Sequence, residues 1–148
     1  MVIAEESLTR DLMVEIVPIL QEHKKALPGY MDEPININWK IYEILAEGGL
    51  LRIYTVRDDG MLVGYAVFTL NPNTRHQHIL QAQQEVLYLR PDFRKGTMGL
   101  LLIKYADKAL SEVGVQVILH NVNVSYDISA LLKRVGYVPL EQTYIKRV

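Results

Sequence analysis

The sequence predicts a single α/β domain, residues 1–148, in which helices cover a mixed β-sheet. Two observations predict this class. A hairpin pattern follows two amphipathic helices, and a strand–helix–strand unit occupies the second half of the chain. Apolar residues make up 49% of the composition, which is enough for one hydrophobic core.

The first helix is predicted to begin after Thr9, whose side chain suits an N-cap. Leu12, Ile16 and Ile19 then recur at three- and four-residue spacing, so one face of this helix is apolar. Pro18 is expected to kink it. Residues 27–34, which hold two prolines and a glycine, are predicted to be a linker.

The second helix is predicted from about Asn38 to Glu47. Its inward-facing residues are Trp39, Tyr42 and Leu45, and Gly48 ends it. A β-hairpin is predicted to follow this helix.

Two segments rich in β-formers, Leu50–Val56 and Met61–Leu70, make up this hairpin. They flank Arg57–Gly60, in which Asp59-Gly60 supplies the turn chemistry. The polar stretch that follows, with His76, His78 and three glutamines, is expected to be a long connection. A short buried strand, Val86–Leu89, is then predicted to end before Pro91.

The second half of the chain continues with a helix, Gly99–Val113, and a strand, Val115–Leu119. This strand and Val86–Leu89 should be parallel because a helix connects them. A last helix is predicted at Asp127–Val135, and Tyr137–Arg147 is expected to form one or two final strands.

Composition argues against several classes of function. Sixteen Lys and Arg balance seventeen Asp and Glu, so no net positive field favours nucleic acid. The absence of cysteine excludes thiolate chemistry and Cys-based zinc sites. Residues 1–11 do not resemble a signal peptide, and no apolar run approaches the length needed to cross a membrane, so we expect a cytoplasmic protein.

Residues 87–99 combine a strand, a basic loop with glycines and the start of a helix. A helix N-terminus exposes unpaired N–H groups, so such a loop can hold a pyrophosphate. Arg94 and Lys95 would add charge, and Gly96 and Gly99 would let the backbone approach the phosphate. On this pattern alone, an ordinary loop that enters a helix is an equally good interpretation.

The same segment resembles motif A of the GNAT superfamily of N-acetyltransferases. Leu89-Arg90-Pro91-Asp92-Phe93-Arg94 matches the end of the central strand in that family, and Lys95-Gly96-Thr97-Met98-Gly99 matches its phosphate loop, although Thr97 replaces the central glycine. Leu132–Tyr137 resembles the later helix–Gly–aromatic pattern. His76 and Tyr144-Ile145-Lys146 resemble features of a small phage and prophage branch.

The resemblance implies a GNAT fold with a mostly antiparallel sheet, acetyl-CoA as cosubstrate and no metal. It places the pantetheine arm along the backbone of Leu87, Tyr88 and Leu89, and Ser125 at a cofactor-contacting position. The implied pyrophosphate site consists of Arg94, Lys95, Gly96, Thr97, Met98 and Gly99.

For catalysis, the resemblance makes Glu85 the general base and the Leu89 N–H the oxyanion donor. Glu85 could equally be a solvated carboxylate at a strand edge. Many family members carry, at the position of Leu132, a tyrosine that protonates the departing CoA thiolate. Tyr144 is the candidate that replaces this general acid here, and water is the alternative proton donor. His120 is a candidate acceptor contact, although a hydrogen-bonded core histidine is the commoner role.

The acceptor is expected to be a primary amine, on a small molecule or a protein, that attacks the thioester directly. His76 and the region from Leu27 to Trp39 are candidates for its contacts. His76 and His78 alone make a poor metal site. A GNAT-fold module that binds acyl-CoA without transferring anything is the main alternative, and a purely structural α/β protein is the second. The C-terminal strands could also pair across a homodimer axis.

Overall fold

The computed structural model describes residues 1–27 and 33–148, so part of the predicted linker, residues 28–32, lies outside the described residues. Five strands form one sheet in the order β1-β2-β3-β4-β5. The strands are β1 (Val2–Glu5), β2 (Leu51–Asp58), β3 (Met61–Pro72), β4 (Leu80–Leu89) and β5 (Val117–Leu119). The helices are α1 (Arg10–Ala26), α2 (Trp39–Glu47), the short 3-10 helix η1 (Pro91–Phe93), α3 (Met98–Glu112) and α4 (Ser129–Arg134).

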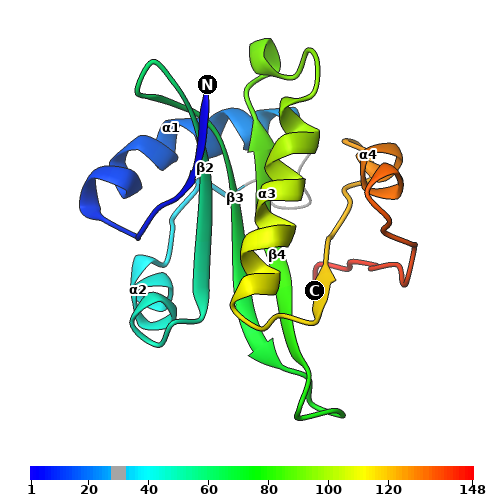
Figure 1. Ribbon diagram of the computed structural model, residues 1–148. Helices are drawn as coiled ribbons and strands as arrows, with labels where there is room; N and C mark the ends of the chain where they lie inside the picture. Colours follow the sequence, from blue (N-terminus) through cyan, green and yellow to red (C-terminus); the bar gives the residue numbers. More distant parts are fainter. Residues whose placement is uncertain (28–32) are drawn as a thin grey trace.

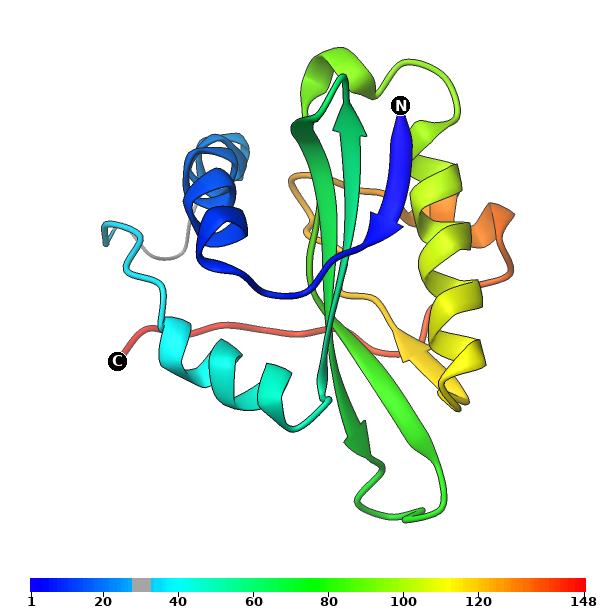
Figure 2. The same cartoon turned by 60° about the vertical axis from the view of Figure 1, so that its left-hand side comes forward.

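The layers agree with the predicted fold class. Helices α1 and α2 cover one face of the sheet and α3 covers the other (Figures 1 and 2). Strands β1 to β4 are antiparallel to their neighbours, and β4 pairs with β5 in parallel. The predicted strand–helix–strand unit is therefore confirmed. Among the described residues, no helix is both long enough and apolar enough to cross a membrane.

The N-terminal helices begin where their caps indicate. The Thr9 hydroxyl accepts a hydrogen bond from the Leu12 N–H at 3.2 Å, and the Asn38 side chain accepts one from the Ile41 N–H at 3.3 Å. Helix α1 buries Leu12 and the two isoleucines of its predicted apolar face. No residue of α2 is fully buried, although Trp39 is partly buried against the core on the α1 side of the sheet.

The hairpin is also confirmed. Asp59 and Gly60 have φ angles of 48° and 81°, which are the left-handed values that a tight two-residue hairpin turn requires. Sequence reasoning missed β1, a strand of only four residues that pairs with β2 through Val2–Glu5.

Strand β4 is longer than predicted. It begins at Leu80, so the expected long connection shrinks to the residues around His76 and His78. Ala82 and Gln84 point into the α3 side of the core and are almost completely buried. The glutamines concealed this alternation, because buried Gln84 is satisfied by His120 from outside the strand rather than by solvent.

The predicted C-terminal strands are wrong. Residues 137–148 run as an extended segment without strand pairing, and the side chains of Val138 and Tyr144 are 81% and 87% exposed. The Tyr137 hydroxyl is anchored by donating to Asp107 Oδ1 at 2.5 Å. Pro139 then has no N–H to give to a ladder, which disfavours a strand at this point.

Candidate active site

Strand β4 has an edge that is only partly covered. On one side it pairs with β3 as far as Leu89, whereas on the other side β5 pairs only with Gln81, Ala82 and Gln83. Among the described residues, no strand pairs with the rest of this second edge. The sheet therefore opens from Gln84 to Leu89.

The register shows which backbone groups face the opening. The Arg90 N–H donates to the Val63 carbonyl at 2.9 Å, and Gly64 lies opposite Leu89. This pattern makes Gly64 and Leu89 a pair that exchanges no hydrogen bonds, so the N–H and C=O of Leu89 point away from β3. The same holds for Leu87, two residues earlier. The Tyr88 backbone instead points toward β3, so the prediction that all three residues offer their backbone to pantetheine needs this correction for Tyr88.

Gly64 brings β3 and β4 close together at this position. A Cβ on Gly64 would lie 2.5 Å from Leu89 Cδ1 and 2.9 Å from the Tyr88 carbonyl oxygen. We predict that Gly64→Ala lowers the free energy of unfolding by about 1–3 kcal/mol, because β4 must shift to make room. Urea unfolding measures the change. Gly48→Ala is the matched control, since its Cβ would meet nothing closer than 3.5 Å, and equal losses in the two variants would contradict this explanation.

The Arg94 side chain lies at the end of β4. Its Nε donates to the Leu89 carbonyl at 2.6 Å, and its guanidinium lies between the rings of Tyr88 and Tyr126, 5.1 and 4.7 Å from their centroids. His23 of α1 also stacks on Tyr88, with ring centroids 4.5 Å apart. Arg94 thus fixes the loop after β4. The sequence pattern did not indicate these contacts of its side chain.

The start of α3 has the properties of an anion site. Gly96 has a φ of 93°, a value that side-chain-bearing residues rarely adopt, and it turns the chain into Thr97 and the helix. The Thr97 side chain makes no capping hydrogen bond, so the first-turn N–H groups of Met98 and Gly99 remain available. Lys95 is exposed beside them. These amides and this lysine can hold a phosphate group.

Glu85 occupies a β-bulge. Val67 pairs with Val86 and Phe68 pairs with Gln84, which leaves Glu85 as an extra residue without a partner on β3. The Glu85 side chain is exposed. The pKa of Tyr42 on α2 is raised, first by the burial of that tyrosine and second by the negative charge of Glu85. A carboxylate therefore stands next to the open edge of β4, on the side that faces α2. No sequence signal indicated the bulge.

His120 belongs to the core on the α3 side of the sheet. Its Nδ1 lies 2.8 Å from Gln84 Oε1, and its ring packs edge-on against Phe68 and Tyr137. Burial lowers its pKa to about 4, so the ring is neutral near pH 7. Its Nε2 is buried and has no partner among the described residues. The commoner role, a core histidine, fits these contacts better than an acceptor contact.

The lowered pKa of His120 predicts a pH-dependent stability. In the unfolded chain this ring takes up a proton near the ordinary histidine pKa of 6.5, whereas the folded ring resists protonation down to about 4. Stability is thus fully present above 6.5 and decreases as the pH falls toward 4. We expect a loss of about 1 kcal/mol between about pH 7.5 and pH 5.5 from this group.

Urea unfolding of His120→Gln at several pH values tests this expectation. The variant should lose the part of the slope that His120 contributes, whereas His23, whose pKa is also lowered by burial and by the charge of Arg94, should keep its own part. His76→Gln is the matched control, because the His76 side chain is exposed, and it should keep the slope. A slope unchanged in His120→Gln would assign the pH dependence to other groups.

Three further predicted site residues are exposed, namely His76, Ser125 and Tyr144. His76 and His78 are exposed in the β3–β4 turn, with ring centroids 6.4 Å apart. Ser125 is exposed, and its N–H donates to Asn123 Oδ1. The Tyr144 hydroxyl donates to Gln142 Oε1 at 3.0 Å and otherwise faces solvent. Within residues 1–27 and 33–148, no three His, Asp or Glu side chains gather in a way that could hold a metal ion.

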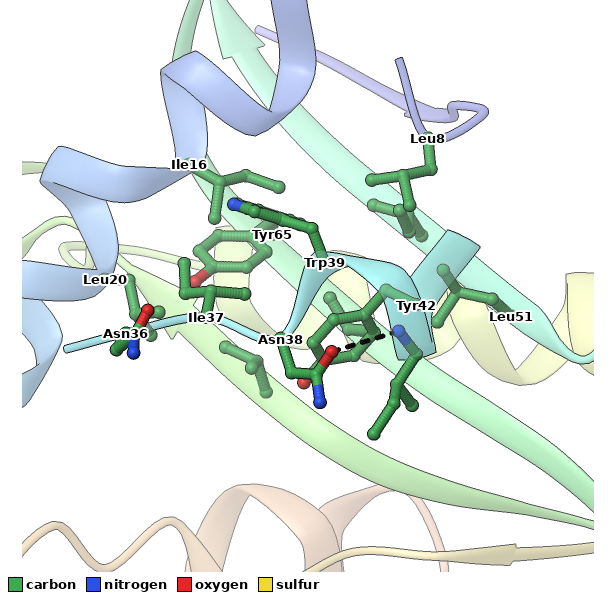
Figure 3. Close-up of a pocket in the computed structure, with 14 residues that line it drawn as sticks. Leu8, Ile16, Leu20, Asn36, Ile37, Asn38, Trp39, Tyr42, Leu51 and Tyr65 are labelled. Atoms are coloured by element: carbon green, nitrogen blue, oxygen red, sulfur yellow. Dashed lines mark hydrogen bonds between the residues drawn. The ribbon is translucent and has the colours of Figure 1, made fainter. Parts of the chain in front are cut away.

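A pocket of about 360 Å³, which sequence reasoning did not identify, lies between α1, α2 and strands β2 to β4 (Figure 3). Its lining is apolar and aromatic, with two asparagines. The lining residues are Leu8, Ile16, Leu20, Asn36, Ile37, Asn38, Trp39, Ile41, Tyr42, Leu51, Ile53, Tyr65, Val67 and Val86. Val86 directly follows Glu85, so the pocket adjoins the bulge.

No family model and no curated protein sequence matches the chain, so the comparison with known proteins rests on solved structures. A predicted acetyltransferase of Clostridium acetobutylicum, solved with acetyl-CoA, matches with a TM-score of 0.74 at 9% identity, over 99% of this chain and 96% of that one. The chain has the fold of GNAT acetyltransferases.

Two further structures of this fold are similar over nearly their whole length. A ribosomal-protein-alanine N-acetyltransferase of Brucella melitensis biovar Abortus has a TM-score of 0.70 and 20% identity, with 100% of both chains covered. The aminoglycoside N-acetyltransferase AAC(6')-Iy, in complex with CoA, has a TM-score of 0.71 and 13% identity, over 99% of this chain and 98% of that one. The GNAT fold thus spans the whole described chain.

Proposed function

We propose that this GNAT-fold protein is an N-acetyltransferase that moves an acetyl group from acetyl-CoA to a primary amine. The observation that carries the proposal is the open edge of β4. It presents the free backbone groups of Leu87 and the Leu89 N–H, continues toward the unpaired amides of α3, and adjoins the Glu85 carboxylate. In this proposal the extended pantetheine arm of acetyl-CoA pairs with the backbone groups of β4, its pyrophosphate lies on the α3 amides, and its thioester lies beside Glu85.

In the proposed reaction, the chain supplies a base and a hydrogen-bond donor. Glu85 takes a proton from the acceptor ammonium, directly or through water, and the free amine nitrogen attacks the thioester carbonyl. The Leu89 N–H, which points into the opening, donates to the oxygen as negative charge develops. A C–N bond forms and the C–S bond breaks, so the CoA thiolate leaves. The nitrogen then loses its second proton, which passes through water to the thiolate and leaves the neutral amide.

The departing thiolate needs no tyrosine from the chain. Leu132 is buried where many family members carry one, and Tyr144 is 87% exposed. A thiolate with a pKa near about 8.5 is a tolerable leaving group at neutral pH. Water in the opening is therefore the proposed proton donor, in place of Tyr144.

An acetylation assay with a broad panel of amines and peptides tests the proposal. We expect free CoA thiol to appear in amounts equal to the acetylated amine. The alternative, a module that binds acetyl-CoA without transfer, is favoured by the missing tyrosine, and it predicts binding of acetyl-CoA with no thiol release from any acceptor. A homodimer, the phage-type branch and a cytoplasmic location stay predictions from the sequence.

A further inference from the structure

We propose that the pocket beneath α1 and α2 receives the uncharged body of the acceptor, so that the substrate class is a small primary amine with an apolar, aryl-sized group. This inference rests on the proposed acetyltransferase function, because the amino group must end beside Glu85. The pocket is then the feature of the protein that selects the acceptor.

The charge of the lining separates this class from polycationic acceptors. None of the 14 lining residues carries a charge. A polyamine or an aminoglycoside has several ammonium groups, each of which would lose its hydration in the pocket without a carboxylate to pair with. An apolar group gains by leaving water instead. The volume of about 360 Å³ lies in the range of small-molecule sites, so one ring can enter.

Tyr65 points to a second feature of the ligand. Its side chain is 1% exposed, and its hydroxyl has no hydrogen-bond partner among the described residues. Burial raises its pKa, so the group stays a protonated donor. An unpaired buried hydroxyl is costly, and an oxygen on the ligand would satisfy it. Tyr65 lines the pocket together with Trp39, Ile37 and Tyr42, all of which are labelled in Figure 3.

The position of Glu85 in the bulge determines which way the acceptor amine lies in the pocket. Val86 and Tyr42 both line the pocket, and the charge of Glu85 acts on Tyr42. The carboxylate thus lies near the pocket, whose 14 lining residues are uncharged. An amine with its apolar group inside would place its ammonium at the carboxylate and its nitrogen near the open edge of β4.

Fluorescence of Trp39 provides a direct binding measurement, because it is the single tryptophan of the chain and lines the pocket. Phenethylamine and tyramine are the probes, and spermidine and kanamycin represent polycations. We expect the two aryl amines to change Trp39 emission with saturation, and to be acetylated with a higher kcat/KM than the polycations. A higher kcat/KM for either polycation, or unchanged emission with both aryl amines, would overturn the inference.

Two variants of α2 locate the binding. Ile41 lines the pocket and Ile44 does not, yet they are similarly exposed, at 53% and 57%, so neither change should prevent folding. Ile41→Lys should weaken phenethylamine binding at least several-fold, because its ammonium repels the probe, whereas Ile44→Lys should not. Equal effects of the two variants would place the binding elsewhere.

Two tyrosine variants test the hydrogen bond. Tyr65→Phe should remove any preference for tyramine over phenethylamine, a difference of about 2- to 10-fold for one hydrogen bond. Tyr54→Phe is the matched control, since Tyr54 also has a buried unpaired hydroxyl but lies in the core on the α3 side. Loss of the preference in both variants, or in neither, would refute the role of Tyr65.

The outcomes also separate this inference from the function on which it rests. Saturable Trp39 quenching with no thiol release from any amine would keep the pocket and end the acetyltransferase proposal. Thiol release with spermidine or kanamycin, but none with the aryl amines, would keep the acetyltransferase and end the proposed substrate class.

Discussion

Glu85→Gln is expected to lower kcat by about 10²–10⁴-fold, the usual contribution of a general base, while the Kd for CoA stays the same. Glutamine keeps the size of the side chain and its place in the bulge but cannot accept a proton from the acceptor ammonium. Glu85 is exposed, so the fold should not depend on its charge. Steady-state kinetics at neutral pH, together with calorimetric titration of CoA, measures both quantities.

Glu47→Gln is the control for that variant, because it removes another exposed carboxylate, at the end of α2. It should leave kcat unchanged. If Glu85→Gln also retained kcat, Glu85 would be a solvated carboxylate at a strand edge and the proton would have to leave through water. A parallel loss of CoA binding would indicate a damaged site instead of a missing base.

Gly99→Asp is expected to weaken CoA binding by about 5-fold to 1,000-fold. The range corresponds to repulsion between two unit charges at about 4 Å, from about 1 kcal/mol in water to about 4 kcal/mol near a protein surface. Space does not forbid the side chain, since a Cβ on Gly99 would meet Leu131 Cδ2 at 3.5 Å. An aspartate in the first turn also favours the helix, so the variant should fold.

Gly99→Asn separates charge from bulk. It has nearly the shape of aspartate without the charge, so it should lose much less affinity for CoA. Calorimetry measures both variants. Equal affinities in the two would make the effect steric, and wild-type affinity in Gly99→Asp would place the pyrophosphate away from the start of α3.

Local patterns made much of the fold predictable. The Asp59-Gly60 turn and the apolar face of α1 were recognised because each depends on neighbours in the sequence. Strand β4 was predicted too short because Gln84 is buried through a bond to His120, a partner 36 residues away. The final strands were wrong because β-forming residues alone do not supply a partner strand.

The site was predictable in outline and not in detail. The motif pointed to the end of β4 and the start of α3. Whether the Arg94 side chain reaches the helix or turns back to Leu89 depends on Tyr88 and Tyr126, which a motif does not describe. The bulge at Glu85 arises from pairing with β3, and the pocket arises from the packing of α1 and α2 on the sheet. Both are tertiary features.

A crystal structure of the complex with acetyl-CoA tests the central claim most directly. The account predicts that the pantetheine arm pairs with the backbone of Leu87 and Leu89, that the pyrophosphate lies on the Met98 and Gly99 amides, and that the thioester lies beside Glu85. A cofactor bound away from the open edge of β4, or no binding at saturating acetyl-CoA, would contradict it.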